Sequence, residues 1–359
     1  MQSEVKSDDE RRPPNRIGIS ETELERRGLK LELGVPVTGA TTLGDAVVVG
    51  FGDGTIRLFR PGHDPVIHQA HLGVVLCMAA YQDFLVTGGD DGRFLRMTPD
   101  GLIEELDDFD TKWVDCVAAS DGLVACSSGK NVRLWMAGQS KPLNFIHPST
   151  VGGLSFDAKG RRLAVAHYGA VTLWERTKRK WKSSTFAWKG FHGAVTFSPD
   201  GKYLVTAMQE NALHGWRIRD KANLAMSGYP AKVKSFAWTG NTPFLATSGA
   251  DEIICWPFDG KFGPMERSPL CVGHNRKQIA TYVRSLSDEE AVFAGFRDGS
   301  VLLAKLDETT ESLAVRGSNG AEVTAIEVSP SKSHVLIGDA LGNVLWAPLM
   351  SGAEYARNV

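Results

Sequence analysis

Hydrophobic and polar residues alternate along most of the chain in short runs that end at turn residues. The clearest example spans residues 84–97, where the apolar run Phe-Leu-Val-Thr leads through Gly-Gly-Asp-Asp-Gly into Arg-Phe-Leu-Arg-Met. Two strand-sized runs on either side of a Gly/Asp turn predict a β-hairpin. Related hairpins recur at intervals of about 40 residues, and a fixed period of this size is typical of repeat architectures.

The pattern predicts eight such hairpins. Their turns and second strands occupy residues 52–59, 90–97, 129–135, 168–174, 211–216, 251–256, 298–304 and 342–346. Ahead of most of them, another turn, such as Ser-Pro-Asp-Gly at 198–201, joins an earlier short apolar strand to the hairpin. Each repeat is therefore predicted to contain four strands, of which the fourth is the least regular.

The two ends of the chain differ from the repeats. Residues 1–28 are predicted to form a flexible tail with a short helix, in which Ser20 is the N-cap, Glu23 the N3 residue and Gly28 the C′ residue. Residues 29–33 alternate with period two and predict one strand. The last repeat lacks a regular fourth strand before the predicted tail at 351–359. We therefore expect the N-terminal strand to supply the missing fourth strand. The two ends of the repeat region, residues 29–350, would then pair in one sheet and close the repeats into a ring.

The repeats resemble the Trp-Asp (WD) repeat β-propellers over residues from about 29 to 350. The matching features are Asp53, Asp91 and Asp298 in hairpin turns, the pair Gly273-His274, and Trp135, Trp174, Trp216, Trp256 and Trp346 at the ends of third strands. None of these tryptophans is followed by Asp, and Gly-His stands in its expected place once. The resemblance implies a single all-β propeller of four-stranded antiparallel blades. Eight hairpins imply eight blades, and seven, the commonest number in that family, is the alternative.

The resemblance also implies roles for individual side chains. In WD propellers, a His before the first strand, the turn Asp and the Trp form a buried hydrogen-bonded set. By this resemblance the pairs are His71 with Asp91, and His274 with Asp298. The resemblance also implies structural roles for Trp135, Trp174 and Trp256.

Antiparallel strands place the turns on two opposite faces of a propeller. The first face carries the turns between strands two and three and the connections between repeats, and the second face carries the remaining turns. WD propellers often receive peptides on the first face. The candidate partner-binding residues there are Arg93, Lys130, Tyr168, His192, Lys232 and Arg297, a mixed set that suits an interface. On the second face, the candidates are Arg162, Lys178, Arg179 and Lys180 in a basic stretch. Ordinary solvated turns are the competing explanation for both sets.

Composition and motifs argue against several classes of function. The net charge of -2 provides no global attraction to nucleic acid or acidic lipid. The 5 cysteines are odd in number and lack paired metal-site spacing, which favours a reduced, cytoplasmic setting. His63, His68 and His71 fit no compact ligand set on one strand face. Because nucleophile elbows, phosphate-binding glycine loops and paired-His zinc helices are missing from the sequence, we expect no catalytic residue, metal or cofactor.

The sequence therefore predicts a non-enzymatic protein–protein interaction scaffold or adaptor in the cytoplasm. Its partners would be one or more proteins or peptides, among them acidic ones, with no membrane. A propeller enzyme or metal-binding protein that uses the central channel is the first alternative. Nucleic-acid binding through the basic stretch is the second alternative and is disfavoured.

Overall fold

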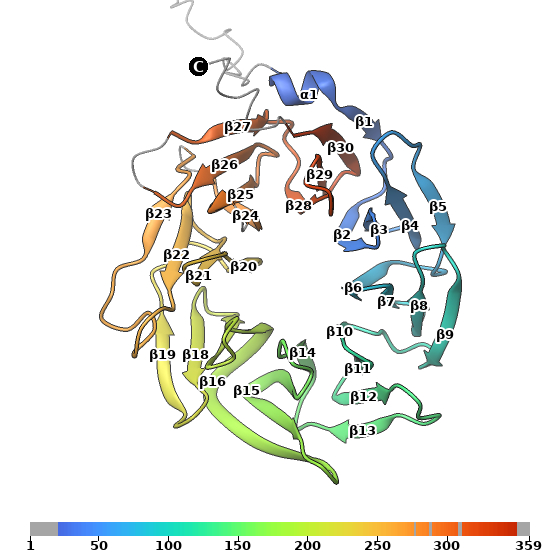
Figure 1. Cartoon of the computed structure of the whole chain (residues 1–359), viewed down its shortest axis with the longest axis vertical. Coiled ribbons are helices and arrows are strands. Elements are labelled where there is room, and N and C mark those ends of the chain that lie inside the picture. Colours follow the sequence, from blue (N-terminus) through green and yellow to red (C-terminus); the bar gives the residue numbers. More distant parts are fainter. Residues whose placement is uncertain (1–20, 276–277, 287–288, 308–310, 350–359) are drawn as a thin grey trace, which may run out of the picture.

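The strands of the protein form a closed ring in which the first strand of each repeat lies inside and the fourth outside (Figure 1). The computed structural model describes residues 21–275, 278–286, 289–307 and 311–349. Within them all paired strands are antiparallel, and each predicted hairpin is present. The prediction of a single all-β propeller is confirmed.

Each of the first three repeats forms one four-stranded sheet. Repeat one contains β2 (Val37–Leu43), β3 (Ala46–Phe51), β4 (Thr55–Phe59) and β5 (Val66–Gln69). Repeat two contains β6 (Val75–Tyr81), β7 (Phe84–Gly89), β8 (Arg93–Met97) and β9 (Ile103–Asp108). Repeat three contains β10 (Cys116–Ser120), β11 (Leu123–Ser128), β12 (Asn131–Met136) and β13 (Leu143–Ile146).

Repeats six to eight have the same form. Repeat six contains β20 (Phe236–Trp238), β21 (Phe244–Thr247), β22 (Ile253–Pro257) and β23 (Leu270–Val272). Repeat seven contains β24 (Ala280–Leu286), β25 (Ala291–Phe296), β26 (Val301–Lys305) and β27 (Leu313–Arg316). Repeat eight contains β28 (Val323–Val328), β29 (His334–Asp339), β30 (Asn343–Pro348) and, from the other end of the chain, β1 (Leu29–Glu32).

Repeats four and five share one sheet. It contains β14 (Val151–Phe156), β15 (Arg162–Arg176), β16 (Trp181–Phe197), β17 (Tyr203–Met208), β18 (Leu213–Arg217) and β19 (Ala222–Met226). The two ends of β15 meet, since Arg176 N donates to Arg161 O over 2.8 Å, so this element is the hairpin of repeat four. β16 pairs with β15 over residues 181–191 and with β17 over residues 192–197. One strand thus serves as the fourth strand of repeat four and the first of repeat five.

This fused sheet decides the blade count. Counted as continuous hydrogen-bonded sheets of the described residues, the ring has 7 blades. This is the alternative number that we considered, not the eight that we expected first. The eight sequence repeats are nonetheless all present. The difference arises because β16 continues through the junction of repeats four and five, with Gly190 at φ 100° in an irregular register, where other repeats have a loop.

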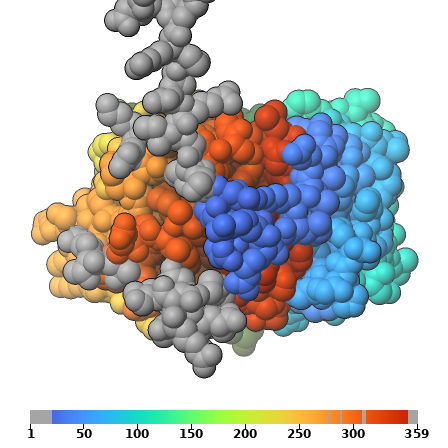
Figure 2. Space-filling model, turned by 90° about the horizontal axis from the view of Figure 1, so that it is seen from above, coloured from blue at the N-terminus to red at the C-terminus, as the bar shows by residue number. Residues whose placement is uncertain are grey.

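The N-terminal strand closes the ring, as predicted. Leu29 pairs with Trp346 and Leu31 with Val344, which makes β1 the outer strand beside β30. Figure 2 shows the N-terminal segment packed directly against the C-terminal repeats. Leu31 and Leu33 also pack on a core cluster that joins repeats eight and one. The closure therefore combines a backbone ladder with apolar burial.

The short helix α1 (Glu23–Arg27) begins two residues later than predicted. Thr22 is its N-cap and Glu25 completes a capping box, so the assignment of these roles to Ser20 and Glu23 is wrong, and Ser20 lies outside the described residues. Tertiary contacts fix this start. Thr22 Oγ1 donates to Val315 O over 2.8 Å, and Glu25 Oε2 accepts from Gly317 N over 2.9 Å.

Gly28 ends the helix in an extended conformation with φ -87°, not in the left-handed one that a C′ glycine was expected to adopt. Glycine is needed at this position for a different reason. A Cβ at this position would lie 2.7 Å from Leu345 Cδ1 and 2.8 Å from Ala347 Cβ. Glycine therefore lets the chain approach β30 closely enough for β1 to pair with it.

The hydrophobic core lies between neighbouring repeats, because each sheet packs its faces on the next sheet around the ring. Buried Leu58, Val75 and Leu95 form one such cluster between repeats one and two. Repeats four and five pack in the same way despite their shared strand, with Val171 and Trp216 in one cluster. The ring thus holds its loops on a continuous rigid support.

Candidate functional site

The backbone of the first face is fixed by hydrogen bonds between its two kinds of loop. Ala70 N donates to Gly54 O over 3.2 Å, Val114 N to Gly89 O over 3.0 Å, and Val151 N to Gly129 O over 2.9 Å. Each bond joins a connection between repeats to a hairpin turn. Side chains on this face therefore project from ordered backbone.

His71 and Asp91 lie together in the best-formed repeat. His71 Nδ1 is 2.9 Å from Asp91 Oδ1, and His71 Nε2 is 2.9 Å from Thr87 Oγ1. Burial, which outweighs the opposing effect of the Asp91 carboxylate, lowers the pKa of His71. Although burial alone would raise the pKa of Asp91, hydrogen bonds from Leu72 N, His71 and Arg93 N lower it. Neutral His71 therefore donates from Nδ1 to an ionised Asp91.

The structure does not bring His274 and Asp298 together in this way. His274 is exposed, and its Nδ1 lies 3.8 Å from Asp251 Oδ2. Asp298 accepts instead from Ser300 N and Ser300 Oγ, at 3.0 and 2.6 Å. Asn275, one residue after His274, donates to Ser300 Oγ over 2.8 Å. The connection into repeat seven thus uses an amide where a histidine was expected.

Two of the three tryptophans assigned structural roles make part-buried side-chain hydrogen bonds. Trp174 Nε1 donates to His147 Nε2 over 3.2 Å, and Trp256 Nε1 donates to Tyr229 OH over 2.6 Å. Trp135 instead packs on Phe94, with ring centroids 5.1 Å apart. His147 and Tyr229 were missed from the sequence. Both lie 27 positions before their tryptophan, a shared spacing that could have revealed them.

The predicted first-face residues do not form one cluster. Lys130, Lys232 and Arg297 are exposed, and Tyr168 is 65% exposed. Arg93 is partly buried, with its guanidinium bound to Glu105 Oε2 at 2.7 Å and to Ala70 O at 3.0 Å. His192 is fully buried, bound to Thr206 Oγ1 and Trp188 O, so its assignment as a surface binding residue is wrong. The cause is β16, which runs through the position where a loop was expected.

On the second face, Arg162 is a structural residue and not a free cation. Its guanidinium donates to Asp157 Oδ2 and Gly201 O, both at 2.9 Å, and lies over the Phe197 ring. The basic residues around Arg162, by contrast, form a surface that we call the basic hairpin. We use this name for the exposed residues Lys159, Arg161, Arg176, Lys178, Arg179, Lys180 and Lys182. Among the described residues, none of these seven forms an ion pair.

Large apolar side chains are exposed on the first face. Leu72, Trp113, Tyr168 and Leu341 are 85%, 58%, 65% and 63% exposed. Three of them donate their own backbone N–H to a side-chain oxygen: Leu72 to Asp91, Tyr168 to Ser149, and Leu341 to Asp339. Of these, Leu72 and Leu341 were missed, because a single leucine in a loop carries no periodic signal.

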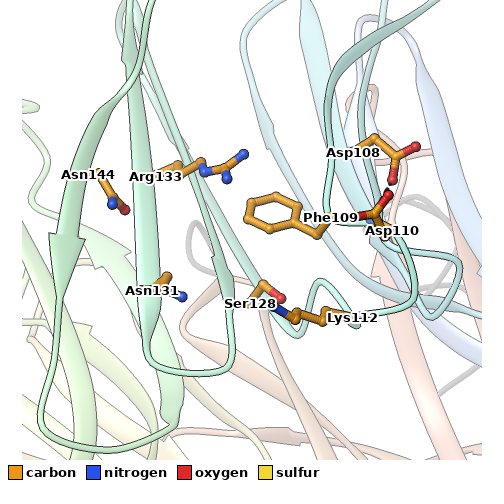
Figure 3. Close-up of a pocket in the computed structure, with 8 residues that line it drawn as sticks. All are labelled: Asp108, Phe109, Asp110, Lys112, Ser128, Asn131, Arg133 and Asn144. Carbon is orange, nitrogen blue, oxygen red and sulfur yellow. Dashed lines mark hydrogen bonds between the residues drawn. The ribbon is translucent and has the colours of Figure 1, made fainter.

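A pocket of about 210 Å³ opens between repeats two and three (Figure 3). One wall is the connection that contains Asp108, Phe109, Asp110 and Lys112. The other wall is formed by Ser128, Asn131, Arg133 and Asn144 of repeat three. The lining is polar apart from the Phe109 ring.

Within the part of the chain that the structure describes, no three His, Cys, Asp or Glu side chains are grouped as metal ligands. In that same part, no helix is long and apolar enough to cross a membrane. None of the 5 cysteines, all of which the structure describes, forms a disulfide, and burial raises the pKa of Cys116 to about 11 and that of Cys255 to about 12. These thiols are therefore protonated at neutral pH.

Comparisons with known proteins agree with the fold. No protein-family model matches the sequence. The small ribosomal subunit protein RACK1y of Oryza sativa subsp. japonica is 23% identical over 140 residues, which cover 38% of this chain and 41% of that protein. A ribosome biogenesis protein WDR12 homolog of Drosophila virilis is 26% identical over 122 residues, which cover 32% of this chain and 29% of that protein. The matches thus span less than half of either relative.

Two solved structures have the same fold. The C-terminal WD40 domain of Sif2 superimposes with a TM-score of 0.71 at 14% identity, covering 90% of this chain and 98% of that domain. The computationally designed Ika8 protein superimposes with a TM-score of 0.64 at 18% identity, covering 88% and 97%. The molecule is thus a β-propeller with loop faces. The resemblance to WD-repeat propellers is confirmed.

Proposed function

We propose that the protein is a non-enzymatic interaction scaffold that binds partner proteins through its first face. The observation that carries the proposal is the set of exposed apolar side chains Leu72, Trp113, Tyr168 and Leu341 on one ordered face. Trp and Tyr are enriched at protein interfaces, where a few large side chains carry most of the binding energy. Aromatic anchors held on rigid backbone lose little conformational entropy on binding, so they favour affinity.

The relatives support this class of function. One is named as a small ribosomal subunit protein and the other as a ribosome biogenesis protein. From these names we infer for this chain only that it acts as part of a larger assembly. The five cysteines form no disulfide among the described residues, which supports our assignment of the protein to the reducing cytoplasm.

Exchange of first-face apolar residues tests the scaffold function. The double variant Leu72→Ser/Tyr168→Ser should abolish capture of partners that the unaltered chain retains from its native cells, without changing the melting temperature. Leu102→Ser is the matched control, because Leu102 is 67% exposed on the second face. Quantitative mass spectrometry of the captured proteins compares the three forms. Identical partner profiles for the double variant and the unaltered chain would count against the first face.

A second interaction surface is favoured by the unpaired charges of the basic hairpin. Turn residues Thr177 and Lys180 are held together, since Lys180 N donates to Thr177 Oγ1 over 3.1 Å. The hairpin therefore presents its cations from an ordered turn, and the complementary ligand is an acidic protein segment. Nearby Trp188 is stacked on His214 at 4.0 Å and Trp181 packs on Phe145, so both rings are engaged within the fold. This use of the aromatic rings disfavours base stacking by single-stranded nucleic acid.

A further inference from the structure

The two sides of repeat three differ in character. Arg133 and Asn144 stand directly opposite each other on β12 and β13, and Asn131 lies on the same side two positions earlier. Phe145 points to the other side and stacks on Trp174 of repeat four at 3.9 Å. Repeat three is therefore closed by aromatic packing toward repeat four, while its side facing repeat two carries polar groups around an open pocket.

The opposite wall of the pocket is held in place. Asp110 N donates to Asp108 Oδ1 over 2.8 Å, and Phe109 N donates to Gly92 O over 2.9 Å. A Cβ on Gly92 would lie 2.1 Å from Asp110 O, so only glycine permits this close approach. Arg133 lies 4.2 Å over the Phe109 ring and binds Asp107 Oδ2 at 2.5 Å, which ties the two walls together. The pocket is thus preformed.

Three polar side chains of the pocket have no hydrogen-bond partner within the described residues. Ser128 is 4% exposed, and its buried Oγ is unpartnered. The amides of half-buried Asn131 and exposed Asn144 also make no side-chain hydrogen bond there. Buried polar groups are almost always hydrogen-bonded in folded proteins, and an unpartnered one calls for an explanation. This applies to the Ser128 hydroxyl. A polar group bound in the pocket would give that hydroxyl a partner and would also pair with the two amides.

The charges of the lining select the kind of ligand. Two cations, Lys112 and Arg133, line the pocket together with two carboxylates, Asp108 and Asp110, and Arg133 is also paired with Asp107. An anionic ligand would meet these carboxylates, and a cationic ligand would meet the two cations. A neutral group that both donates and accepts hydrogen bonds suits a lining that carries both signs of charge.

We propose that this pocket binds the carboxamide side chain of an Asn or Gln residue in a partner protein. The proposal rests on the scaffold function and names the partner residue for one part of it. Trp113 follows Lys112 on one wall, and Ile146, which is 67% exposed, pairs opposite Asn131 on the other. Apolar residues that flank the amide in the partner would pack on these two side chains.

The test titrates the full chain with five blocked pentapeptides, Ac-Leu-Gly-Xaa-Gly-Leu-amide, in which Xaa is Gln, Asn, Glu, Lys or Ala. Binding is followed by saturation-transfer NMR. The Gln or Asn peptide should bind about tenfold more tightly than the other three, in line with the discrimination of a site built to pair polar groups. No binding by the Gln and Asn peptides, equal binding by all five, or tightest binding by the Glu or Lys peptide would overturn the proposal.

Variants locate the binding site. Asn144→Ala and Ser128→Ala should each weaken binding of the Gln or Asn peptide about tenfold, since each removes a polar contact. Asn241→Ala, an exposed second-face residue, is the control and should leave binding unchanged. Ser128→Ala should keep or raise the melting temperature, because its hydroxyl has no partner in the fold. If Asn144→Ala leaves the affinity for the peptide unchanged, the peptide binds elsewhere and the proposal is contradicted.

The outcome is separable from that of the scaffold test. Loss of partner capture by the Leu72/Tyr168 double variant together with absent peptide binding would leave the scaffold standing and refute the amide pocket. Unaltered capture by that double variant, together with amide-selective peptide binding that depends on Asn144, would refute the first-face apolar set and retain the pocket.

Discussion

Asp91 binds both the side chain of His71 and the backbone of the residue that follows it. Its Oδ1 is 2.9 Å from His71 Nδ1, and its Oδ2 accepts from Leu72 N over 2.9 Å. One carboxylate therefore connects the hairpin turn of repeat two to the connection that carries Leu72, the most exposed large apolar side chain on the first face. Stability of the repeat and order of the interaction face depend on the same residue.

Asp91→Ala tests this dual role. The change removes the acceptor of His71 Nδ1, Leu72 N and Arg93 N, so we expect the free energy of unfolding to fall by about 2–3 kcal/mol. Asp121→Ala alters an exposed turn and should cost less than about 0.5 kcal/mol. Urea denaturation compares the two variants. Equal stability of both would show that the His71–Asp91 contact contributes little.

Tyr229→Phe removes a single hydroxyl from a buried network. Tyr229 OH accepts from Trp256 Nε1 at 2.6 Å and lies 2.7 Å from Thr247 Oγ1. Without the hydroxyl, the Trp256 N–H loses its partner in the core, so the variant should lose about 1–3 kcal/mol of stability. Tyr168→Phe is the matched control because that ring is 65% exposed. Thermal unfolding measures both, and a melting temperature unchanged by Tyr229→Phe would argue against the network.

Acidification should destabilise the propeller through two buried histidines. Burial lowers the pKa of His147 and of His214 to about 4, below the ordinary value of 6.5. The unfolded chain therefore binds these protons first. Each histidine contributes fully to the free energy of unfolding above about pH 6.5. This contribution falls as the pH decreases toward 4, by about 3 kcal/mol per histidine.

His147→Gln separates this effect from general acid denaturation. Glutamine is neutral throughout the range and can still accept from Trp174 Nε1, so stability of the variant should decline less steeply between pH 6.5 and 4. Asp91, whose pKa is lowered, contributes to the loss only at more acidic pH. Parallel stability curves for the variant and the unaltered chain would exclude His147 as a source of the slope.

The periodic part of the architecture could be predicted because each hairpin encodes its own turn and strand alternation. The His71–Asp91 contact followed from a known repeat pattern, and closure followed from an unpaired strand at 29–33. His192 was misplaced because the sequence around Gly190 marks a turn, while the packing of repeats four and five lets β16 run on. The local sequence pattern does not show whether a strand ends at a turn or continues and pairs with a strand of the next repeat.

The candidate site could be predicted less well, because side chains meet there across repeats. Arg162 looked like part of a basic surface, yet Asp157 within its own turn and Gly201 from the next repeat hold it. Asn131, Arg133 and Asn144 carry no motif, and only the register of β12 and β13 places them around one pocket. Such groupings depend on the rotation of one sheet against another.

Gly28→Ala probes the closure of the ring. The added Cβ would lie within 2.8 Å of Leu345 and Ala347 side-chain atoms, so β1 must shift from β30 or those residues must repack. We expect a loss of about 1–3 kcal/mol, the usual cost of overpacking. Gly39→Ala is the control, since its Cβ would meet only Met78 at 3.7 Å. Equal melting temperatures for the two variants would indicate that the closure tolerates a wider spacing.

Charge reversal in the basic hairpin tests the proposed acidic partner. Arg179→Glu/Lys180→Glu should abolish binding of a Glu-rich peptide and leave the melting temperature unchanged, since neither residue forms an ion pair within the described residues. Lys202→Glu/Arg219→Glu is the control, because Asp200 and Asp220 already pair with those cations. Titrations at rising salt should show affinity falling as the charges are screened. Tighter binding of single-stranded RNA than of the peptide would assign the surface to nucleic acid instead.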